Sequence, residues 1–287
     1  MTPGDLARDT AVTKLAVAPG WYTAELSNAW DFRTPSGGAL MTVAMRAMQQ
    51  ELADPALRPL SANTHFCSPV PAGPLEIRVE VLRHGGAAAQ VRAQLSSTTV
   101  PGPGLEVSAT FARDRAGVDL VDTAPPAVPP PTECPSFDEA PIMAGRERPR
   151  FFGNLESRLA QGHMVGSDWL AGPARIARWF RYRAPQRLAD GRFDPLALLL
   201  ADTMPPALIQ KIGPGHEPFF APSLDLTVHF LEDTSAEWIL IAVHVPRARA
   251  GYATADAQIW DDRGRLIATA TQMMLLRRIA DARLAPV

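Results

Sequence analysis

An aspartate in the apolar segment LALLLADTMPP (196–206) has a position that suits acid–base chemistry. Asp194 and Pro195 provide a typical helix start, and two prolines that disrupt a helix follow Asp202 closely. Asp202 is therefore predicted near the C-terminus of a mostly apolar helix, where the helix dipole and burial both disfavour a negative charge. Such groups are common at functional sites, which makes Asp202 a candidate acid or base. The alternative is a carboxylate that reaches solvent or caps a neighbouring loop.

A second candidate, Gln272, is an uncharged amide on the apolar face of a predicted strand. Within GRLIATATQMMLLRR (264–278) the residues alternate from Leu266 onward, as in a strand with one face turned inward. The residues that share the face of Gln272 are Leu266, Ala268, Ala270, Met274 and Leu276. A buried amide without partners costs about 1–3 kcal/mol. Gln272 therefore either joins its strand to a loop through hydrogen bonds or faces a site that needs an amide.

The third candidate is a hydroxyl at the head of the predicted strand in APSLDLTVHF (221–230). Ser223 is the first polar residue there, although a lone serine beside a proline is commonly a turn residue. Asp225 and Thr227 lie on the polar side of the same strand and compete with Ser223 for this place. Sequence alone leaves that choice open.

Two halves of the 287-residue chain resemble each other. PLSANTHF (59–66) matches SLDLTVHF (223–230) at the leucine and the closing His-Phe. LEVSATF (105–111) matches LIATATQ (266–272), and the order and the spacing of the two matches are nearly the same in both halves. The matched histidines, His65 and His229, are expected to pack on their strands and not to act in a site.

The first half lacks the candidate groups at its matched positions. It has Pro59 where the second half has Ser223, and Phe111 where the second half has Gln272. The repeat therefore predicts one site per chain, in the second half. The first predicted helix is entered through Pro-Ser-Gly-Gly (35–38), whose glycine pair either packs closely on the sheet or presents free backbone donors to a carbonyl oxygen.

A proline-rich segment separates the halves. Residues 123–150 contain eight prolines, which lack a backbone donor and favour an extended connector. We therefore predict an N-terminal repeat over residues 1–122, a linker over 123–150 and a C-terminal repeat over 151–287.

Each half is predicted to contain one helix followed by antiparallel strands, an α+β arrangement. The helices are expected over residues 37–52 and 194–208, and the second is apolar nearly all round, so protein must surround it. The strands are expected in the segments LEIRVEVLR, AQVRAQLSS and LEVSATFAR of the first half, and in SLDLTVHFL, WILIAVHVP, YATADAQIW and RLIATATQMMLL of the second. The turn DDRG (261–264) joins the last two strands as a hairpin.

Composition and motifs exclude several classes of protein. The net charge of −2, with scattered arginines, indicates neither a nucleic-acid nor an anionic-membrane partner. The two cysteines, Cys67 and Cys134, have no metal-site spacing, and no signal peptide or membrane-length apolar run is present, so a soluble cytoplasmic protein is expected. The chain has no G-x-S-x-G elbow, nucleotide-binding glycine motif or H-E-x-x-H pattern. We expect no metal and no cofactor.

The segments LLLAD, PSLDLTVHF and DDRGRLIATATQ resemble the acyl-CoA thioesterase II family and its thioesterase-like relatives. The resemblance implies a double hotdog fold, in which each of two repeats wraps an antiparallel sheet around a central helix. It implies an acyl-CoA substrate, a homo-oligomer and a catalytic trio that orients the water attacking the thioester carbonyl. The trio maps onto Asp202, Ser223 and Gln272, with serine where well-known members have threonine.

Two other functions are compatible with such a fold. A non-catalytic acyl- or acyl-CoA-binding protein would keep the fold without the chemistry, although the three polar groups, kept together in one half, favour an enzyme. Hotdog dehydratases use an aspartate with a histidine a few residues later, and no histidine follows Asp202 until His216. Hydration is therefore disfavoured.

Overall fold

One antiparallel sheet of twelve strands forms the framework of the protein in the computed structural model, which describes residues 3–16, 18–139, 148–164, 168–217 and 219–278. The strands, in their order across the sheet, are β1 (Val12–Lys14), β2 (Trp21–Leu26), β4 (Gly73–His84), β5 (Ala88–Ser97), β6 (Leu105–Ala112), β3 (Arg58–Phe66), β10 (Ser223–Phe230), β13 (Leu266–Leu275), β12 (Tyr252–Asp261), β11 (Ile239–Arg249), β8 (Arg175–Tyr182) and β7 (Leu155–Gln161). The α+β prediction is confirmed, and the strands expected from alternating residues are all present.

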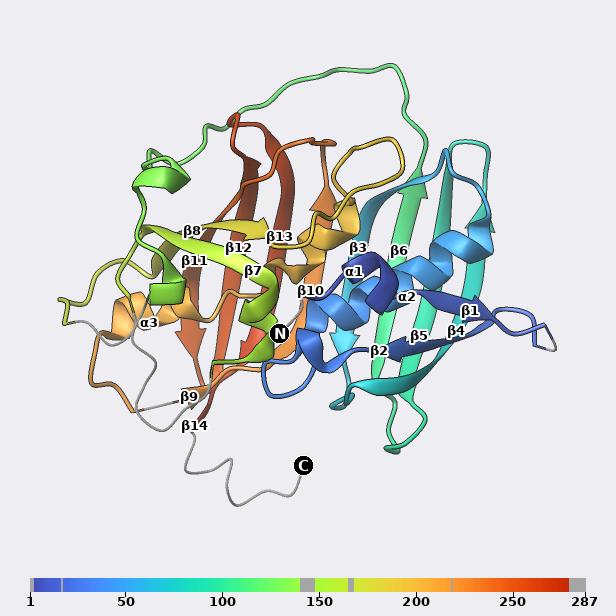
Figure 1. The fold of residues 1–287 in the computed structure, drawn as a ribbon, viewed down its shortest axis with the longest axis horizontal. Helices are drawn as coiled ribbons and strands as arrows, with labels where there is room; N and C mark the ends of the chain where they lie inside the picture. The colour runs from blue at the N-terminus through green and yellow to red at the C-terminus, as the bar shows by residue number, and fades with distance from the viewer. Residues whose placement is uncertain (1–2, 17, 140–147, 165–167, 218, 279–287) are drawn as a thin grey trace.

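The two halves of the chain join at the pairing of β3 with β10 (Figure 1). These strands are antiparallel, with Thr227 opposite Asn63, and the amide of Asn63 donates a hydrogen bond to the Thr227 hydroxyl at 2.7 Å. Pairing of the two central strands leaves no open edge between the halves. The matched histidines His65 and His229 are both exposed on these strands, so the expectation that they pack there is only partly met.

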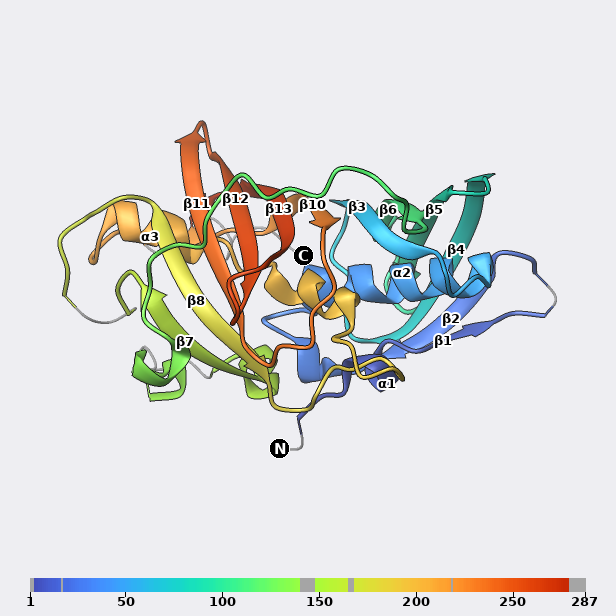
Figure 2. The same cartoon turned by 90° about the horizontal axis from the view of Figure 1, so that it is seen from above.

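The first predicted helix has the bounds that the sequence indicated. Helix α2 (Gly37–Leu52) begins after Ser36, whose side chain accepts a hydrogen bond from the Ala39 amide at 3.2 Å. It ends where Ala53 adopts a left-handed conformation, with φ of 50°. The helix packs against β4, β5 and β6, so the first half of the sheet curves around it (Figure 2).

The second helix predicted over residues 194–208 is partly confirmed, because the disruption expected at Pro205 and Pro206 is present but the segment before it is not an α-helix. The segment forms a 3₁₀ helix, η5 (Pro195–Ala201), then an irregular stretch that includes Asp202, and then the short helix α3 (Pro206–Ile212). Pro205 and Pro206 have no N–H groups for bonds to the preceding turn, which is why an α-helix cannot continue through them. The predicted burial is confirmed, because Leu196 and Leu199 of η5 are fully buried.

The proline-rich segment runs along the outside of the second half of the sheet (Figure 2). The indole N–H of Trp179, on β8, donates a hydrogen bond to the Pro129 carbonyl at 3.0 Å. Cys134 packs in a small cluster with Trp179, Leu240 and Trp260. This stretch includes the 3₁₀ turns η2 (Pro131–Glu133) and η3 (Phe137–Glu139), while residues 140–147 of the predicted linker lie outside the described residues.

Several short elements were not predicted. They are α1 (Leu6–Asp9), η1 (Asn28–Trp30), η4 (Arg150–Asn154), strands β1 and β7, and a separate two-stranded sheet of β9 (Phe219–Phe220) with β14 (Arg277–Arg278). Most of them are too short to show periodicity in sequence. Within the described ranges, none of the helices has the length and apolar character needed to span a membrane.

Candidate active site

The three candidate side chains converge on one carboxylate oxygen. Asp202 Oδ1 accepts hydrogen bonds from Gln272 Nε2 at 2.5 Å and from the Ser223 hydroxyl at 3.1 Å. Gln272 Nε2 also donates to Ser223 Oγ. Asp202 lies at the end of η5, Ser223 begins β10, and Gln272 lies well inside β13. Residues separated by up to 70 positions thus form one polar group between η5 and the sheet.

A β-bulge turns Ser223 toward the interior. The β10–β13 ladder pairs Ser223 with Met274 and then pairs Asp225 with Met273, so Leu224 is an extra residue in β10. Regular alternation would place Ser223 on the same face as Asp225, but a bulge re-aims the side chain beside it. The bulge therefore separates the serine from the polar residues that follow it.

The two competing residues on β10 make their hydrogen bonds elsewhere. The Asp225 carboxylate accepts a bond from the Met273 backbone N–H at 2.8 Å. The Thr227 hydroxyl accepts one from Asn63, across the junction of the two halves. The geometry thus groups Ser223, and neither of its two competitors, with Asp202.

Burial raises the pKa of the Asp202 carboxyl. The hydrogen bonds from Ser223 and Gln272 act in the opposite direction, because they stabilise the charged form, but their combined effect is smaller. No charged side chain contributes to the shift. Asp202 therefore holds its proton more tightly than an exposed aspartate.

The start of α2 approaches Asp202 from the first half of the chain. A methyl group on Gly37 would lie 2.6 Å from Asp202 Oδ2 and 2.6 Å from Cζ of Phe66, so only glycine fits there without a shift of its neighbours. The close-packing explanation for this glycine therefore holds. The positive end of the α2 dipole also points at the carboxylate, which stabilises its charge.

The first turn of α2 contains backbone N–H groups that are not needed for the helix itself. The N–H groups of Ala39 and Leu40 both donate to the Ser36 carbonyl, and Ala39 also donates to its hydroxyl. The first N–H groups of a helix have no acceptor inside it. Among the described residues, the N–H groups of Gly37 and Gly38 have no acceptor, so the second explanation, donors for a carbonyl oxygen, stays a prediction.

Gln272 has a buried side-chain oxygen that lacks a hydrogen-bond partner among the described residues. Its side chain is buried, with 3 % of its surface exposed, and its Nε2 is used by Asp202 and Ser223. Its Oε1 is buried and accepts no hydrogen bond from the part of the chain that the structure describes. A buried polar atom without a partner is costly, and such atoms are commonly found where a site binds water or substrate.

The approach of Gly37 to Asp202 leads to a first prediction. Gly37→Ala is expected to lower catalytic turnover about 10-fold, because displacement of a positioned group by a fraction of an ångström disturbs attack geometry. Alanine is the better helix former, so loss of the helix does not explain such a drop. Gly86→Ala is the matched control, since a methyl group there meets nothing within 4 Å. Equal turnover of the two variants would contradict the prediction.

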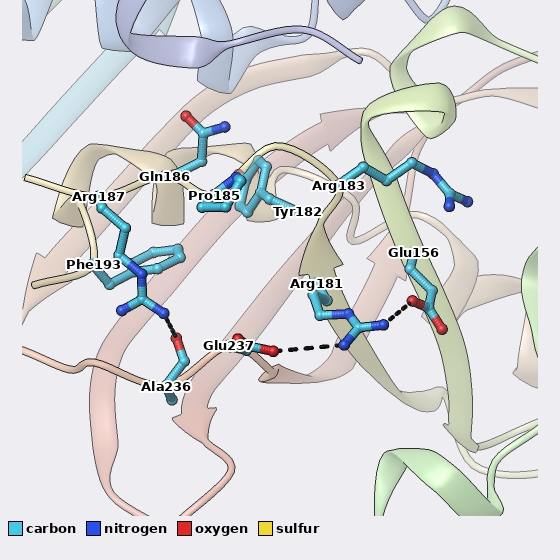
Figure 3. Close-up of a pocket in the computed structure, with 10 residues that line it drawn as sticks. All are labelled: Glu156, Arg181, Tyr182, Arg183, Pro185, Gln186, Arg187, Phe193, Ala236 and Glu237. Atoms are coloured by element: carbon cyan, nitrogen blue, oxygen red, sulfur yellow. Dashed lines mark hydrogen bonds and ion pairs between the residues drawn. The ribbon is translucent and has the colours of Figure 1, made fainter. Parts of the chain in front are cut away.

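A wide surface pocket lies elsewhere on the second half (Figure 3). Its volume is about 510 Å³, and none of the three converging residues lines it. Arg181 in this pocket bonds Glu156 at 2.6 Å and lies 3.6 Å from Glu237, while Arg187 donates to the Ala236 carbonyl. Most polar side chains of this pocket form hydrogen bonds or ion pairs with protein groups. The size of the pocket is therefore no reason to place the candidate site there.

The matched place in the first half has a different chemistry. Pro59 pairs with Phe111 across β3 and β6, as the repeat predicts for a half without the trio. Pro59 lines a small pocket of about 110 Å³ whose charged groups are paired, Arg46 with Asp194 among them. A proline and a phenylalanine offer no group that exchanges a proton.

Comparisons with known proteins identify the family of the chain. The acyl-CoA thioesterase N-terminal domain model matches residues 26–112, and the acyl-CoA thioesterase C-terminal domain model matches residues 131–276. No curated protein matches the sequence.

Similar solved structures share the fold over nearly the whole chain. They include a hot dog fold protein from Alicyclobacillus acidocaldarius, with 19 % identity, a TM-score of 0.78 and full coverage of both chains. A putative thioesterase from Novosphingobium aromaticivorans has 24 % identity, a TM-score of 0.74, and coverage of 93 % of this chain and 98 % of its own. Acyl-CoA thioesterase II TesB2 from Mycobacterium marinum has 22 % identity, a TM-score of 0.72, and coverage of 95 % and 98 %. Because both domain models match in order and the fold agrees, the chain belongs to the acyl-CoA thioesterase family and has the hotdog fold.

Proposed function

We propose that the protein hydrolyses acyl-CoA thioesters to a free acid and CoA, with Asp202, Ser223 and Gln272 orienting the attacking water. The observation that carries the proposal is the meeting of the three side chains at Asp202 Oδ1, next to the start of α2. A buried carboxylate with an elevated pKa, an amide and a hydroxyl form a set that can hold water and accept its proton.

In the proposed reaction, water donates one proton to Asp202 while its oxygen forms a bond to the thioester carbonyl carbon. The carbonyl oxygen becomes an oxyanion, which the N–H groups of Gly37 and Gly38 stabilise at the start of α2. Collapse of this intermediate breaks the carbon–sulfur bond. The departing CoA thiolate takes the proton back from Asp202, so the enzyme returns to its starting state.

Ser223 and Gln272 have positioning roles in this proposal. Their hydrogen bonds to Oδ1 fix the carboxylate, which leaves Oδ2 facing the start of α2. The unpartnered Oε1 of Gln272 is an acceptor for the second proton of the attacking water. Held in this way, the water needs little reorganisation before attack.

The proposal includes an arrangement of two hotdog repeats. Residues 1–122 would form the first and residues 151–287 the second, with 123–150 as the linker and with one active site per chain. Helix α2 is the central element of the first repeat, and η5 takes that place in the second. Assembly into a homo-oligomer, from the family resemblance, and location in the cytoplasm, from the composition of the sequence, are further parts of the proposal.

Release of free thiol from a panel of acyl-CoA substrates of different chain length tests the proposed function. Hydrolysis of at least one substrate well above the rate without protein is expected. Tight binding of acyl-CoA without thiol release would instead identify a non-catalytic acyl-CoA-binding protein, which is the other function compatible with the fold.

The raised pKa of Asp202 predicts the pH dependence of turnover. The carboxyl must be ionised to accept a proton from water, so kcat is expected to fall as pH drops through its folded-state pKa. Because burial raises that pKa, the acidic limb of the kcat profile should lie above 3.8, the ordinary value for aspartate. Profiles measured where circular dichroism shows the protein folded test this. A limb at or below the ordinary value would rule out a buried Asp202 as the base.

A further inference from the structure

Arg178 is a buried arginine without a carboxylate partner. It lies on β8 with 3 % of its surface exposed, and no acidic side chain of the described ranges lies within ion-pair distance of its guanidinium. Burial lowers its pKa to about 10, which still leaves it charged at neutral pH. A buried charge with no opposite charge is unfavourable for folding, so its presence suggests a role other than stability.

The guanidinium is directed at Thr203, the residue that follows Asp202. Arg178 Nη2 donates to the Thr203 carbonyl at 2.5 Å and to its hydroxyl at 2.7 Å. Thr203 is itself buried, with 5 % exposed. The rings of Phe180 and Phe137 lie 5.0 and 5.7 Å from the guanidinium carbon and restrict its position. Arg178 Nη2 therefore binds both the backbone and the side chain of Thr203.

The backbone at Asp202 has little other support. Asp202 has left the 3₁₀ helix, with φ of −61° and ψ of 63°, and its N–H donates to the Leu199 carbonyl at a long 3.4 Å. The two prolines that follow Met204 provide no N–H groups of their own. Anchoring of Thr203 to β8 is therefore the main polar constraint immediately after Asp202.

We infer that Arg178 is a positioning residue for the active site. By fixing Thr203 against β8, it keeps the Asp202 carboxylate within hydrogen-bond distance of Ser223 and Gln272. The inference rests on the proposed function. Arg178 acts through Thr203 and touches no reacting atom. Without the hydrogen bonds from Arg178 to Thr203, Asp202 would shift, and the hydrogen bonds that its Oδ1 accepts would weaken.

Arg178→Met tests the inference, because methionine has a similar length but no donor. We expect kcat to fall about 10-fold with KM nearly unchanged, as for a small misplacement of a catalytic group. Weaker hydrogen bonds to Asp202 also raise its pKa, so the acidic limb of the kcat profile should move to higher pH. Removal of an unpaired buried charge and loss of the two hydrogen bonds to Thr203 have opposite effects on stability, so the thermal midpoint should change little.

Two further variants separate positioning from a structural role. Arg178→Lys keeps one donor toward Thr203 and should recover part of the lost turnover. Thr203→Val removes only the hydroxyl that accepts from Arg178. Its loss of kcat should be smaller than that of Arg178→Met, and the acidic limb of its kcat profile should also move to higher pH. Arg181→Met, on the opposite face of β8, is the matched control and should leave kcat and the pH profile unchanged. If Arg178→Met does not fold, the lysine and valine variants provide the test.

Normal turnover of Arg178→Met, or a loss with an unmoved acidic limb, would overturn the inference. Titration of the Asp202 carboxyl by carbon-13 NMR, assigned by comparison with Asp202→Asn, gives a readout that does not depend on activity. If the wild-type chain releases no thiol, the proposed function fails. An unchanged Asp202 titration in Arg178→Met would instead reject the positioning role alone.

Discussion

Asp202→Asn is expected to lower kcat on a good acyl-CoA substrate by about 10²–10⁴-fold, the usual contribution of a general base. Asparagine keeps the size of the side chain and an oxygen that accepts the bonds from Ser223 and Gln272, but it cannot take a proton from water. KM should change little, because the lost interaction develops only in the transition state. Thiol release at saturating substrate measures the effect.

Stability should change in the opposite direction in this variant. Burial raises the folded-state pKa of Asp202 above its unfolded value, so the protonated form stabilises the fold and that contribution is lost as pH rises through the folded-state pKa. At neutral pH, Asp202→Asn should therefore melt at a higher temperature than the wild type. The difference should disappear below the ordinary pKa of aspartate.

Asp225→Asn is the matched control for Asp202→Asn. The Asp225 oxygen accepts a bond from the Met273 N–H, and an amide oxygen can accept the same bond. This control should retain wild-type turnover. Full thioesterase activity in a folded Asp202→Asn variant would reject the assignment of the base, and a loss of turnover in Asp225→Asn would assign that role to Asp225 instead.

Replacement of Gln272 should have the second-largest effect. Gln272→Ala and the similarly long Gln272→Met are each expected to lower kcat by about 10–10²-fold, less than the loss at Asp202, because an orienting amide positions the water without accepting its proton. Loss of the bond to Asp202 Oδ1 also raises the pKa of Asp202, so the acidic limb should move to higher pH.

Gln272→Met keeps most of the buried volume and so limits the cavity that alanine creates. Thr271→Ala, at the exposed neighbouring position on β13, is the control and should leave both kcat and the pH profile unchanged. A Gln272→Met variant with normal turnover, or with a loss but no shift of the acidic limb, would exclude an orienting role for the amide.

Local patterns in the sequence were enough to predict most elements and part of the site. Alternation placed Gln272 on the inner face of β13 because a strand has a side-chain period of two, and the repeat showed that Pro59 and Phe111 occupy the matched positions. The apolar run over residues 37–52 predicted α2 with the bounds that the structure shows. These signals lie within a few residues of one another, so they do not depend on the rest of the fold.

Other parts of the site depend on contacts that the sequence does not show. Simple alternation gives Ser223 the same face as Asp225, and only the bulge at Leu224, formed against β13, turns it inward. The segment before Asp202 forms a 3₁₀ helix where an α-helix was expected, and Asp202 lies at its C-terminal end. The local sequence does not show which strand pairs with a bulged strand, or which neighbouring element contacts the end of a helix.

The sequence by itself determined which residue types are proposed for the site, which half carries them and which strands contain them. Only the tertiary structure decided that Asp202 lies against Gly37 at the start of α2 and that Arg178 reaches Thr203. The physical reason is distance along the chain. Periodicity and capping arise from residues less than about two turns apart. These contacts join residues separated by 25 or more positions in the sequence, so they form only in the folded chain.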